Sequence, residues 1–255
     1  MIEIHQFPCL SDNYGFLIHD SLSGETAAID TPDAEAYLRE AAAKGWQITQ
    51  VWNTHWHPDH AGGNAAIKAA CQESGGDCTV SGPAEVAKIS APDRVVAHGD
   101  QVTLGAFTAQ VIDVGGHTSG HVAFYLPAAG VAFVGDALFA LGCGRMFEGT
   151  APQFWDSLQR LKALPTDTLM YCAHEYTESN ARFAIHADPD NAALADYVAD
   201  VAKARARGQA TVPFSLSREL TTNPFLRADD SAIQARWGSN AVSAFAALRE
   251  AKNTF

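Results

Sequence analysis

Basic residues are scarce in this sequence. Its 255 residues include 17 Lys and Arg against 29 Asp and Glu, which gives a formal charge of −12. Binding to nucleic acid needs a concentrated basic surface, so this balance argues against a nucleic-acid partner. Long apolar runs are also missing, since none approaches the roughly 20 residues that a membrane helix needs. We therefore expect neither nucleic acid nor a membrane among the partners of the protein.

Closely paired cysteines are absent as well. Five cysteines are scattered along the chain and never spaced as CxxC: Cys9, Cys71, Cys78, Cys143 and Cys172. Reduced thiols in a cytoplasm are the simplest interpretation. The first residues contain no basic segment followed by an apolar stretch, so we expect no secretory signal. These features predict a cytoplasmic protein.

The rest of the composition is that of an ordinary globular protein. Hydrophobic residues make up 47% and charged residues 18% of the chain, which excludes a disordered or fibrous protein. The length suits one large domain, or a domain with a smaller appendage.

Strand and helix patterns alternate along the first two thirds of the chain. A helix is expected after Asp33 as N-cap, ending at Lys44 and Gly45, with further helices over 62–70 and 152–163. Apolar β-runs predict strands at 14–19, 25–30, 48–53, 94–97, 107–114, 122–126, 131–134 and 168–172. This alternation predicts sheets covered by helices, which is the layered α/β class.

The last third of the chain has a different pattern. From residue 175 onward nearly all of the sequence indicates helix or loop, without a strand signal of its own. We therefore expect a main domain over 1–174 and a smaller helical domain over 175–255.

Three of the ten histidines fall within six residues and form the pattern HxHxDH. Such a pattern occurs by chance in roughly one chain per thousand. If the backbone stays extended after the strand at 48–53, the imidazoles of His55 and His57 point the same way. Asp59 and His60 then lie on the turn into the next helix, so both pairs face a common volume.

This motif offers more donor atoms than one metal ion can comfortably use, whereas two adjacent ions can use them all. Imidazole and carboxylate ligands suit zinc, iron or manganese, and no thiolate selects zinc alone. The alternatives are a surface cluster of titrating histidines or a buried hydrogen-bonded network.

Further ligand candidates follow apolar β-runs downstream. They are His117 and His121, then Asp136, then His174. Ligands at the ends of several strands are how a sheet scaffold builds a rigid site. Asp30, also at a strand end, could support a ligand histidine through a hydrogen bond, or could have a core or capping role.

The combination of HxHxDH, a later GHTxGH, a GD after a strand and a final AH resembles the metallo-β-lactamase superfamily. Its fold is an αββα sandwich with the metal site at one edge of the two sheets. Further segments resemble the glyoxalase II (hydroxyacylglutathione hydrolase) family: DNY at 12–14, GCGRMFEG at 142–149, HEY at 174–176 and NPFLR at 223–227. The resemblance covers essentially the whole chain, including a helical C-terminal domain that binds substrate.

The resemblance also implies a set of seven metal ligands. It assigns His55, His57 and His117 to a first metal, Asp59, His60 and His174 to a second, and Asp136 as the bridge between them. Asp59 and Asp136 are the expected catalytic residues of the 1–174 domain. The expected cofactors are two divalent ions, with Zn as the first choice and Fe or Mn as alternatives. His121 matches a family position that is not usually a ligand, so we expect a supporting or structural role.

A glutathione thioester is the substrate that the resemblance implies. Glutathione carries two carboxylates and one ammonium, so we expect a locally basic binding site. Arg145, Tyr176 and Arg227 match substrate-contacting positions of the family. No macromolecular partner is implied, and we expect the chain to act as a monomer.

Two positions depart from the family pattern. Some relatives have a basic residue where this chain has Asp230, and some have Tyr where it has Phe147. Both changes remove potential contacts to glutathione. Lys252 and Arg249, near the C-terminus, are candidate substitutes.

The expected chemistry is hydrolysis. Two divalent ions bring four positive charges, and two carboxylates with one hydroxide leave a net charge of about +1 at the site. We therefore expect a bridging water to ionise near neutral pH and to act as the nucleophile. This machinery suits esters, thioesters, lactones, amides or phosphodiesters alike. The motifs place no separate general acid at the site, and a thiolate can leave unprotonated, which favours a thioester.

The resemblance therefore implies hydrolysis of S-D-lactoylglutathione and related S-2-hydroxyacylglutathiones to D-lactate and glutathione, in methylglyoxal detoxification. Three alternatives stay open. One is a persulfide dioxygenase of the same superfamily with a single iron, the second is a lactonase, and the third is a non-catalytic glutathione- or metal-binding module.

Overall fold

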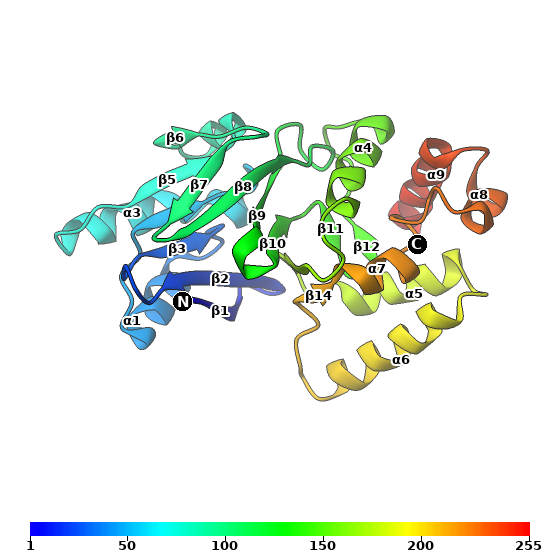
Figure 1. Cartoon of the computed structure of the whole chain (residues 1–255), viewed down its shortest axis with the longest axis horizontal. Coiled ribbons are helices and arrows are strands. Elements are labelled where there is room, and N and C mark those ends of the chain that lie inside the picture. Colours follow the sequence, from blue (N-terminus) through cyan, green and yellow to red (C-terminus); the bar gives the residue numbers. More distant parts are fainter. The chain divides into compact units, whose positions relative to one another are not determined.

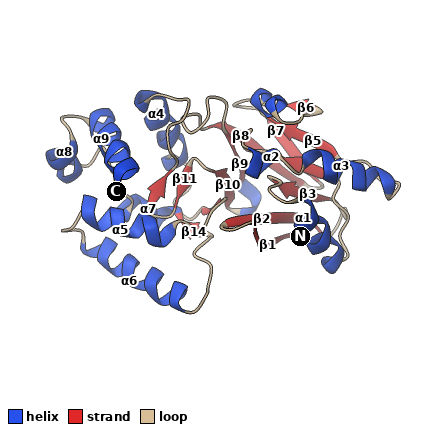
Figure 2. Ribbon diagram, turned by 180° about the vertical axis from the view of Figure 1, so that it is seen from behind, coloured by secondary structure: helices blue, strands red, loops and turns tan.

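The computed structural model describes all 255 residues and divides them into two compact units. Unit 1 comprises residues 1–113 and 120–135, and unit 2 comprises residues 114–119 and 136–255. Each unit contains both strands and helices, as Figure 2 shows in red and blue. None of the helices combines the length and hydropathy that crossing a bilayer requires.

The first sheet of unit 1 has six strands in chain order. They are β1 (Ile2–Cys9), β2 (Asn13–Asp20), β3 (Thr26–Ile29), β4 (Gln50–Trp52), β5 (Thr79–Gly82) and β6 (Arg94–Val95). β1 to β3 pair antiparallel, and β3 to β6 pair parallel. Parallel neighbours need long crossovers, and helices α1 (Ala34–Lys44) and α3 (Asn64–Glu73) lie in two of them (Figure 1).

The remaining strands of unit 1 form an antiparallel set. β7 (Gln101–Leu104), β8 (Phe107–Asp113), β9 (Val122–Leu126) and β10 (Val131–Gly135) pair in chain order, with two short 3₁₀ helices in this unit, η1 (Ala84–Lys88) and η2 (Pro127–Ala129). Every residue of β9 and β10 is buried. The ring of Phe16 from β2 lies 5.6 Å from that of Phe133 from β10, so the two sets of strands pack face to face.

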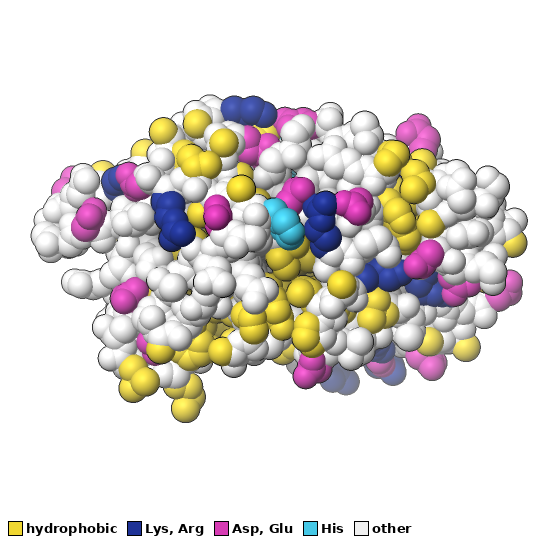
Figure 3. Space-filling view, turned by 45° about the horizontal axis from the view of Figure 1, so that its top comes forward, with side chains coloured by type: hydrophobic (Ala, Val, Ile, Leu, Met, Phe, Trp, Pro, Cys, Tyr) yellow, Lys and Arg dark blue, Asp and Glu magenta, His cyan; other side chains and the backbone are white.

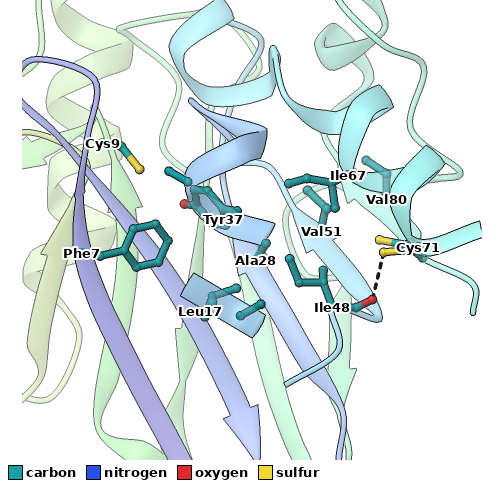
Figure 4. Packing of buried hydrophobic residues seen from close by; sticks show 13 residues of the cluster. Phe7, Cys9, Leu17, Ala28, Tyr37, Ile48, Val51, Ile67, Cys71 and Val80 are labelled. Atoms are coloured by element: carbon teal, nitrogen blue, oxygen red, sulfur yellow. Dashed lines mark hydrogen bonds between the residues drawn. The ribbon is translucent and has the colours of Figure 1, made fainter. Parts of the chain in front are cut away.

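Helix α1 forms where local signals predict it. The Asp33 side chain accepts a hydrogen bond from the N–H of Ala36, and Gly45 ends the helix in the left-handed conformation, with φ of 71°. Its buried face includes Tyr37, whose hydroxyl donates to the carbonyl of Ile29 at 2.7 Å and accepts from the N–H of Phe16 at 3.0 Å. Figure 4 shows this ring within the apolar core that α1 covers.

All five cysteines are buried and unpaired. Burial raises the pKa of the Cys9 and Cys78 thiols to about 12 and that of Cys143 to about 11. In Figure 4 the sulfur of Cys71 donates to the carbonyl oxygen of Ile48, at 3.2 Å. These thiols are therefore part of the packed interior.

Unit 2 is mainly helical, as the yellow to red segments of Figure 1 show. Its helices are α4 (Ala151–Lys162), α5 (Thr177–Ala187), α6 (Ala192–Ala206), α7 (Leu216–Thr222), α8 (Ser231–Trp237) and α9 (Ala241–Thr254). Two antiparallel strand pairs accompany them: β11 (Leu138–Phe139) with β12 (Gly142–Cys143), and β13 (Leu169–Cys172) with β14 (Phe214–Ser215). β14 lies beyond residue 175, where nearly all of the chain was expected to be helix or loop and no strand was predicted.

The β11–β12 hairpin is held by buried polar side chains of the helices. Asn180 donates to the carbonyl of Ala140 at 3.1 Å, and Glu219 accepts from the N–H of Leu141 at 2.7 Å. Asn223 donates to carbonyls on both sides of the turn, at 3.2 and 3.0 Å. Leu141 has φ of 57°, an unfavourable conformation for a leucine, and these bonds hold it there.

We predict that Glu219 makes the stability of the protein depend on pH. The side chain is fully buried, and burial raises the pKa of its carboxyl from 4.5 to about 7. The folded state therefore holds a proton that the unfolded chain releases, so this contribution to stability is complete below pH 4.5 and is lost as the pH rises through about 7. Glu219→Gln keeps the side chain neutral, so between pH 4.5 and pH 8 the wild type should lose about 3 kcal/mol of unfolding free energy relative to the variant.

Urea unfolding at several pH values measures this difference. Glu250→Gln, at an exposed position of α9, is the control and should follow the wild type at every pH. Parallel stability curves for the wild type and Glu219→Gln would contradict the raised pKa.

Candidate metal centre

The HxHxDH motif lies directly after β4 in unit 1. The strand ends at Trp52, and the short helix α2 (Pro58–Ala61) contains Asp59 and His60. The rings of His55 and His60 are fully buried, with centroids 4.0 Å apart. Nε2 of His55 lies 3.0 Å from Nδ1 of His57, and Nε2 of His60 lies 3.6 Å from a carboxylate oxygen of Asp59. Unit 1 thus brings all four motif side chains together, as expected.

The carboxylate of Asp30 orients this group. It accepts from Nδ1 of His60 at 2.8 Å and from both the N–H and the hydroxyl of Thr54, at 2.7 and 2.9 Å. The Thr54 hydroxyl in turn lies 3.0 Å from Nδ1 of His55. Holding one ring nitrogen fixes the imidazole so that the other is presented as a ligand atom. Of the two roles considered for Asp30, the structure favours support of a histidine.

A buried amide network holds the backbone of α2. Asn53 donates to the carbonyl of His60 at 2.9 Å, and Asn64 donates to Asn53 at 2.7 Å. Asn13, from the DNY segment, donates to both the carbonyl and the carboxylate of Asp59, each at 3.3 Å. Sequence reasoning identified neither Asn53 nor Asn64, because an asparagine beside a motif carries no signal of its own.

His121 lies next to the motif and is also fully buried. Its ring stacks on that of His55, with centroids 4.5 Å apart and planes 17° apart. The stacking places it against a ligand candidate and is compatible with the supporting role expected for it.

Unit 2 contains the other three ligand candidates, all of them buried. Nε2 of His117 lies 3.3 Å from one carboxylate oxygen of Asp136, and Nε2 of His174 lies 3.4 Å from the other. Nδ1 of His117 donates to the carbonyl of Arg145 at 2.9 Å, which leaves Nε2 as its ligand atom. Each carboxylate oxygen of Asp136 therefore faces a different imidazole.

Gly144 leaves no free space beside these residues. A Cβ at this position would lie 2.0 Å from the carbonyl oxygen of Asp136 and 3.1 Å from Nδ1 of His117. Only glycine allows the backbone to pass so close to the Asp136 carbonyl and the His117 ring. Each unit thus contains a group of imidazole and carboxylate donor atoms. In each group a protein oxygen holds one ring nitrogen of a histidine. Such donor groups fit the binding of a divalent metal ion.

Two aromatic rings cover the histidines of unit 2. Tyr176 stacks on His174 with centroids 4.7 Å apart and planes 3° apart, and 38% of its surface is exposed. Phe147, which is 61% exposed, meets the ring of His117 edge-on at 5.2 Å. The sequence-predicted contact Tyr176 is therefore next to a ligand candidate.

Arg227 is tied to two carboxylates. Its guanidinium donates to Asp230 at 2.9 Å and also to Asp188. The side chain is only 15% exposed. Asp230, where some relatives have a basic residue, thus neutralises part of the charge that was expected to bind glutathione.

Other basic groups are distributed over the surface. On the face shown in Figure 3, Lys and Arg side chains (dark blue) are interspersed with Asp and Glu (magenta). Arg145 is exposed, whereas Lys252 is half-buried and donates to the carbonyl of Ser179 at 3.1 Å. Burial and the positive charge of Arg249 lower the pKa of Lys252 to about 8.

Comparison with known families agrees with these features. The family model described as the metallo-beta-lactamase superfamily matches residues 15–174, so the chain is a member of that class. The model described as the hydroxyacylglutathione hydrolase C-terminus matches residues 175–255. The chain belongs to the hydroxyacylglutathione hydrolase family, as the sequence motifs predicted.

Curated relatives match over the full length. A hydroxyacylglutathione hydrolase of Erythrobacter litoralis is 64% identical, with 100% of both chains covered. One of Hyphomonas neptunium is 57% identical, covering 100% of this chain and 99% of the relative.

Solved structures share the fold. ETHE1 from Myxococcus xanthus has a TM-score of 0.69 at 27% identity, over 97% of this chain and 90% of that one. TTHA1623, in a di-iron-bound form, has a TM-score of 0.55 at 26% identity, over 68% of this chain and 91% of that one. The predicted metallo-β-lactamase fold with a C-terminal helical domain is confirmed.

We predict that Asp30 sets the metal affinity of the motif in unit 1. Asp30→Asn keeps the shape and tolerates the φ of 53° at this position, but it replaces an acceptor by an amide facing the donors of Thr54 and His60. Zinc binding, measured by competition with a chromophoric chelator, should weaken about 10- to 100-fold while the circular dichroism stays unchanged. Asp33→Asn, which preserves a good helix N-cap, should bind zinc as the wild type does. Wild-type affinity in Asp30→Asn would show that Asp30 does not orient His60.

Proposed function

We propose that this chain hydrolyses the thioester bond of S-D-lactoylglutathione and related S-2-hydroxyacylglutathiones, which releases D-lactate, or the matching hydroxy acid, and glutathione. The observation that carries this proposal is the full-length identity of 47–64% to curated hydroxyacylglutathione hydrolases. The match of residues 175–255 to the C-terminal model of the same family supports it. We propose that this activity serves methylglyoxal detoxification.

We further propose that two divalent metal ions are its cofactors. The His and Asp groups of the chain and its superfamily are consistent with a dinuclear site, and the di-iron form of TTHA1623 supports it. The proposed ligands are His55, His57 and His117 for the first ion and Asp59, His60 and His174 for the second, with Asp136 as the bridge. Zinc is the first choice, with iron or manganese as alternatives, because imidazole and carboxylate sites accept all three.

Bound metal ions would supply Lewis acidity that lowers the pKa of water and stabilises negative charge on the thioester carbonyl. The residues of the chain perform the other tasks. Asp59 and Asp136 offset part of the positive charge, and Asp30 holds Nδ1 of His60. Since glutathione leaves as a thiolate, hydrolysis does not depend on a protein acid to protonate the leaving group.

Arg145, Tyr176 and Arg227 are the proposed contacts to glutathione. The exposed position of Arg145 suits a substrate carboxylate, and Tyr176 presents its ring and hydroxyl beside His174. Arg227 is already paired with Asp188 and Asp230, so we propose that it contributes less than Arg145.

The proposed location is the cytoplasm, which the five free cysteines support because disulfides are rare in reducing compartments. The monomeric state stays a prediction from the sequence.

Removal of the proposed bridging ligand tests the metal centre. Asp136→Ala should lower the metal content from two ions per chain to one or none and reduce thioester hydrolysis at least about 100-fold. Elemental analysis and the loss of thioester absorbance measure the two effects. Asp190→Asn, at an exposed position, is the control. Near-normal turnover in Asp136→Ala would refute the bridging role.

The substrate contacts predict a separation of KM from kcat. Arg145→Ala removes a contact remote from the reacting bond, so KM should rise about 10-fold while kcat changes less than about threefold. Arg227→Ala should raise KM by a smaller factor. Steady-state kinetics with S-D-lactoylglutathione measures both, and a fall in kcat at constant KM would contradict the assignment.

The same assays separate the alternative activities. Hydrolysis of lactones faster than thioesters would indicate a lactonase, and one iron per chain with persulfide-dependent oxygen uptake would indicate a dioxygenase. Two bound metals without turnover of any of these substrates would indicate a binding module.

A further inference from the structure

The turn between β1 and β2 contains an exposed leucine in an unfavourable conformation. Cys9 pairs with Asn13 across the two antiparallel strands, so residues 10–12 form the turn. The φ of Leu10 is 47°, in the left-handed region that glycine and asparagine tolerate and other residues rarely adopt. The Leu10 side chain is also 58% exposed. Neither the backbone conformation nor the burial of apolar surface therefore favours a leucine at this position.

A second exposed leucine of unit 1 shows that exposure alone is ordinary. Leu22, in the turn between β2 and β3, is 83% exposed, but it is not among the residues with positive φ. Isolated apolar side chains on a protein surface need no special explanation. Leu10 differs because backbone strain is added to exposure, and strained residues cluster at functional sites.

The β1–β2 turn lies beside the HxHxDH motif in the same unit. Asn13 donates to both the carbonyl and the carboxylate of Asp59, each at 3.3 Å. Leu10 is two Cα steps from Asn13, one of about 5 Å across the strand pair and one of about 3.8 Å along the chain. The Asp59 side chain is 38% exposed, so this side of the motif is open to solvent. A molecule bound at the motif is therefore within reach of the turn.

The proposed substrates need an apolar contact that the motif itself does not offer. They share the glutathione part and the 2-hydroxy group, and they differ in the side group of the acyl part, which is a methyl group in the lactoyl thioester. The imidazoles and carboxylates of the motif are polar groups suited to oxygen atoms and metal ions. A hydrocarbon side group is favoured by an apolar surface, which removes it from water.

We infer that Leu10 contacts the side group of the acyl part and makes the enzyme prefer the larger 2-hydroxyacyl groups. The inference rests on the proposed thioester hydrolysis and names a specificity-determining residue for it. It also explains the exposure of Leu10 in the free protein, because the apolar side chain is covered only when substrate is bound.

Three substitutions separate the apolar side chain from the backbone strain. Leu10→Asn removes the apolar surface and suits the positive φ, whereas Leu10→Ala removes most of the apolar surface but keeps the crowded Cβ. Leu10→Met keeps an apolar side chain of similar volume. Leu22→Asn makes the matched change at an exposed leucine of another turn and is the control.

The first measurement compares two substrates that differ in the side group alone. S-Glycoloylglutathione has no side group, and S-mandeloylglutathione has a phenyl group. In Leu10→Asn and Leu10→Ala, the kcat/KM for the phenyl substrate should fall about 3- to 10-fold relative to that for the glycoloyl substrate, which is less than a closed pocket would give. Leu10→Met and Leu22→Asn should keep the wild-type ratio within about twofold.

A second measurement detects the same contact without turnover. S-Benzylglutathione and S-methylglutathione are thioethers, so the enzyme has no thioester bond in them to hydrolyse. Isothermal titration calorimetry should show that the wild type and Leu22→Asn bind the benzyl compound more tightly than the methyl compound. In Leu10→Asn this preference should shrink about 3- to 10-fold.

A third measurement follows stability, because a residue that packs within the protein would behave differently. In urea unfolding, Leu10→Asn should have a higher midpoint than the wild type, since asparagine relieves the backbone strain and little packing is lost. Leu22→Asn should leave the midpoint unchanged. A lower midpoint in Leu10→Asn would show that Leu10 stabilises the fold, and it would overturn the inference.

The inference and the proposed function fail separately. Wild-type substrate ratios in both Leu10→Asn and Leu10→Ala would overturn the inference while thioester hydrolysis stands. A wild type that hydrolyses none of these thioesters would refute the function, and the two thioethers would then decide the inference. Failure of the wild type to prefer the benzyl thioether would count against the contact in either case.

Discussion

The proposed metal chemistry depends in unit 2 on one buried carboxylate with an imidazole at each oxygen. The carboxylate oxygens of Asp136 lie 3.3 Å from Nε2 of His117 and 3.4 Å from Nε2 of His174. All three side chains are buried. An ionised carboxylate in such surroundings is costly unless positive charge accompanies it. A divalent cation would provide that charge, so the burial of these three side chains suits the proposed metal site.

In both units a protein oxygen orients one of the buried histidine rings. In unit 1 the Asp30 carboxylate holds Nδ1 of His60, and in unit 2 the Arg145 carbonyl holds Nδ1 of His117. In unit 1 the Asp30 carboxylate is itself held by the N–H and the hydroxyl of Thr54. Residues from other parts of the chain therefore orient the histidine rings, whereas the candidate ligands themselves lie in short sequence motifs.

This division explains what the sequence could predict. Helix α1 was predicted with its caps, because Asp33 and Gly45 act locally. Strand 48–53 is in fact Gln50–Trp52. β1 was not predicted because only two of its eight side chains are buried and its sequence gives little apolar alternation. Of the site, motif spacing identified His55 to His60. Asn53 and Thr54 were not recognised as orienting groups, since their roles arise from contacts with segments that only the fold brings near.

The buried cysteines have a consequence for an enzyme that releases a thiol. At neutral pH a thiol with a pKa of about 11, such as that of Cys143, is ionised in roughly one molecule in ten thousand. Mixed disulfides form through an accessible thiolate, and these sulfurs are neither ionised nor accessible. Burial of the five thiols therefore disfavours mixed disulfides between the protein and the glutathione that it releases.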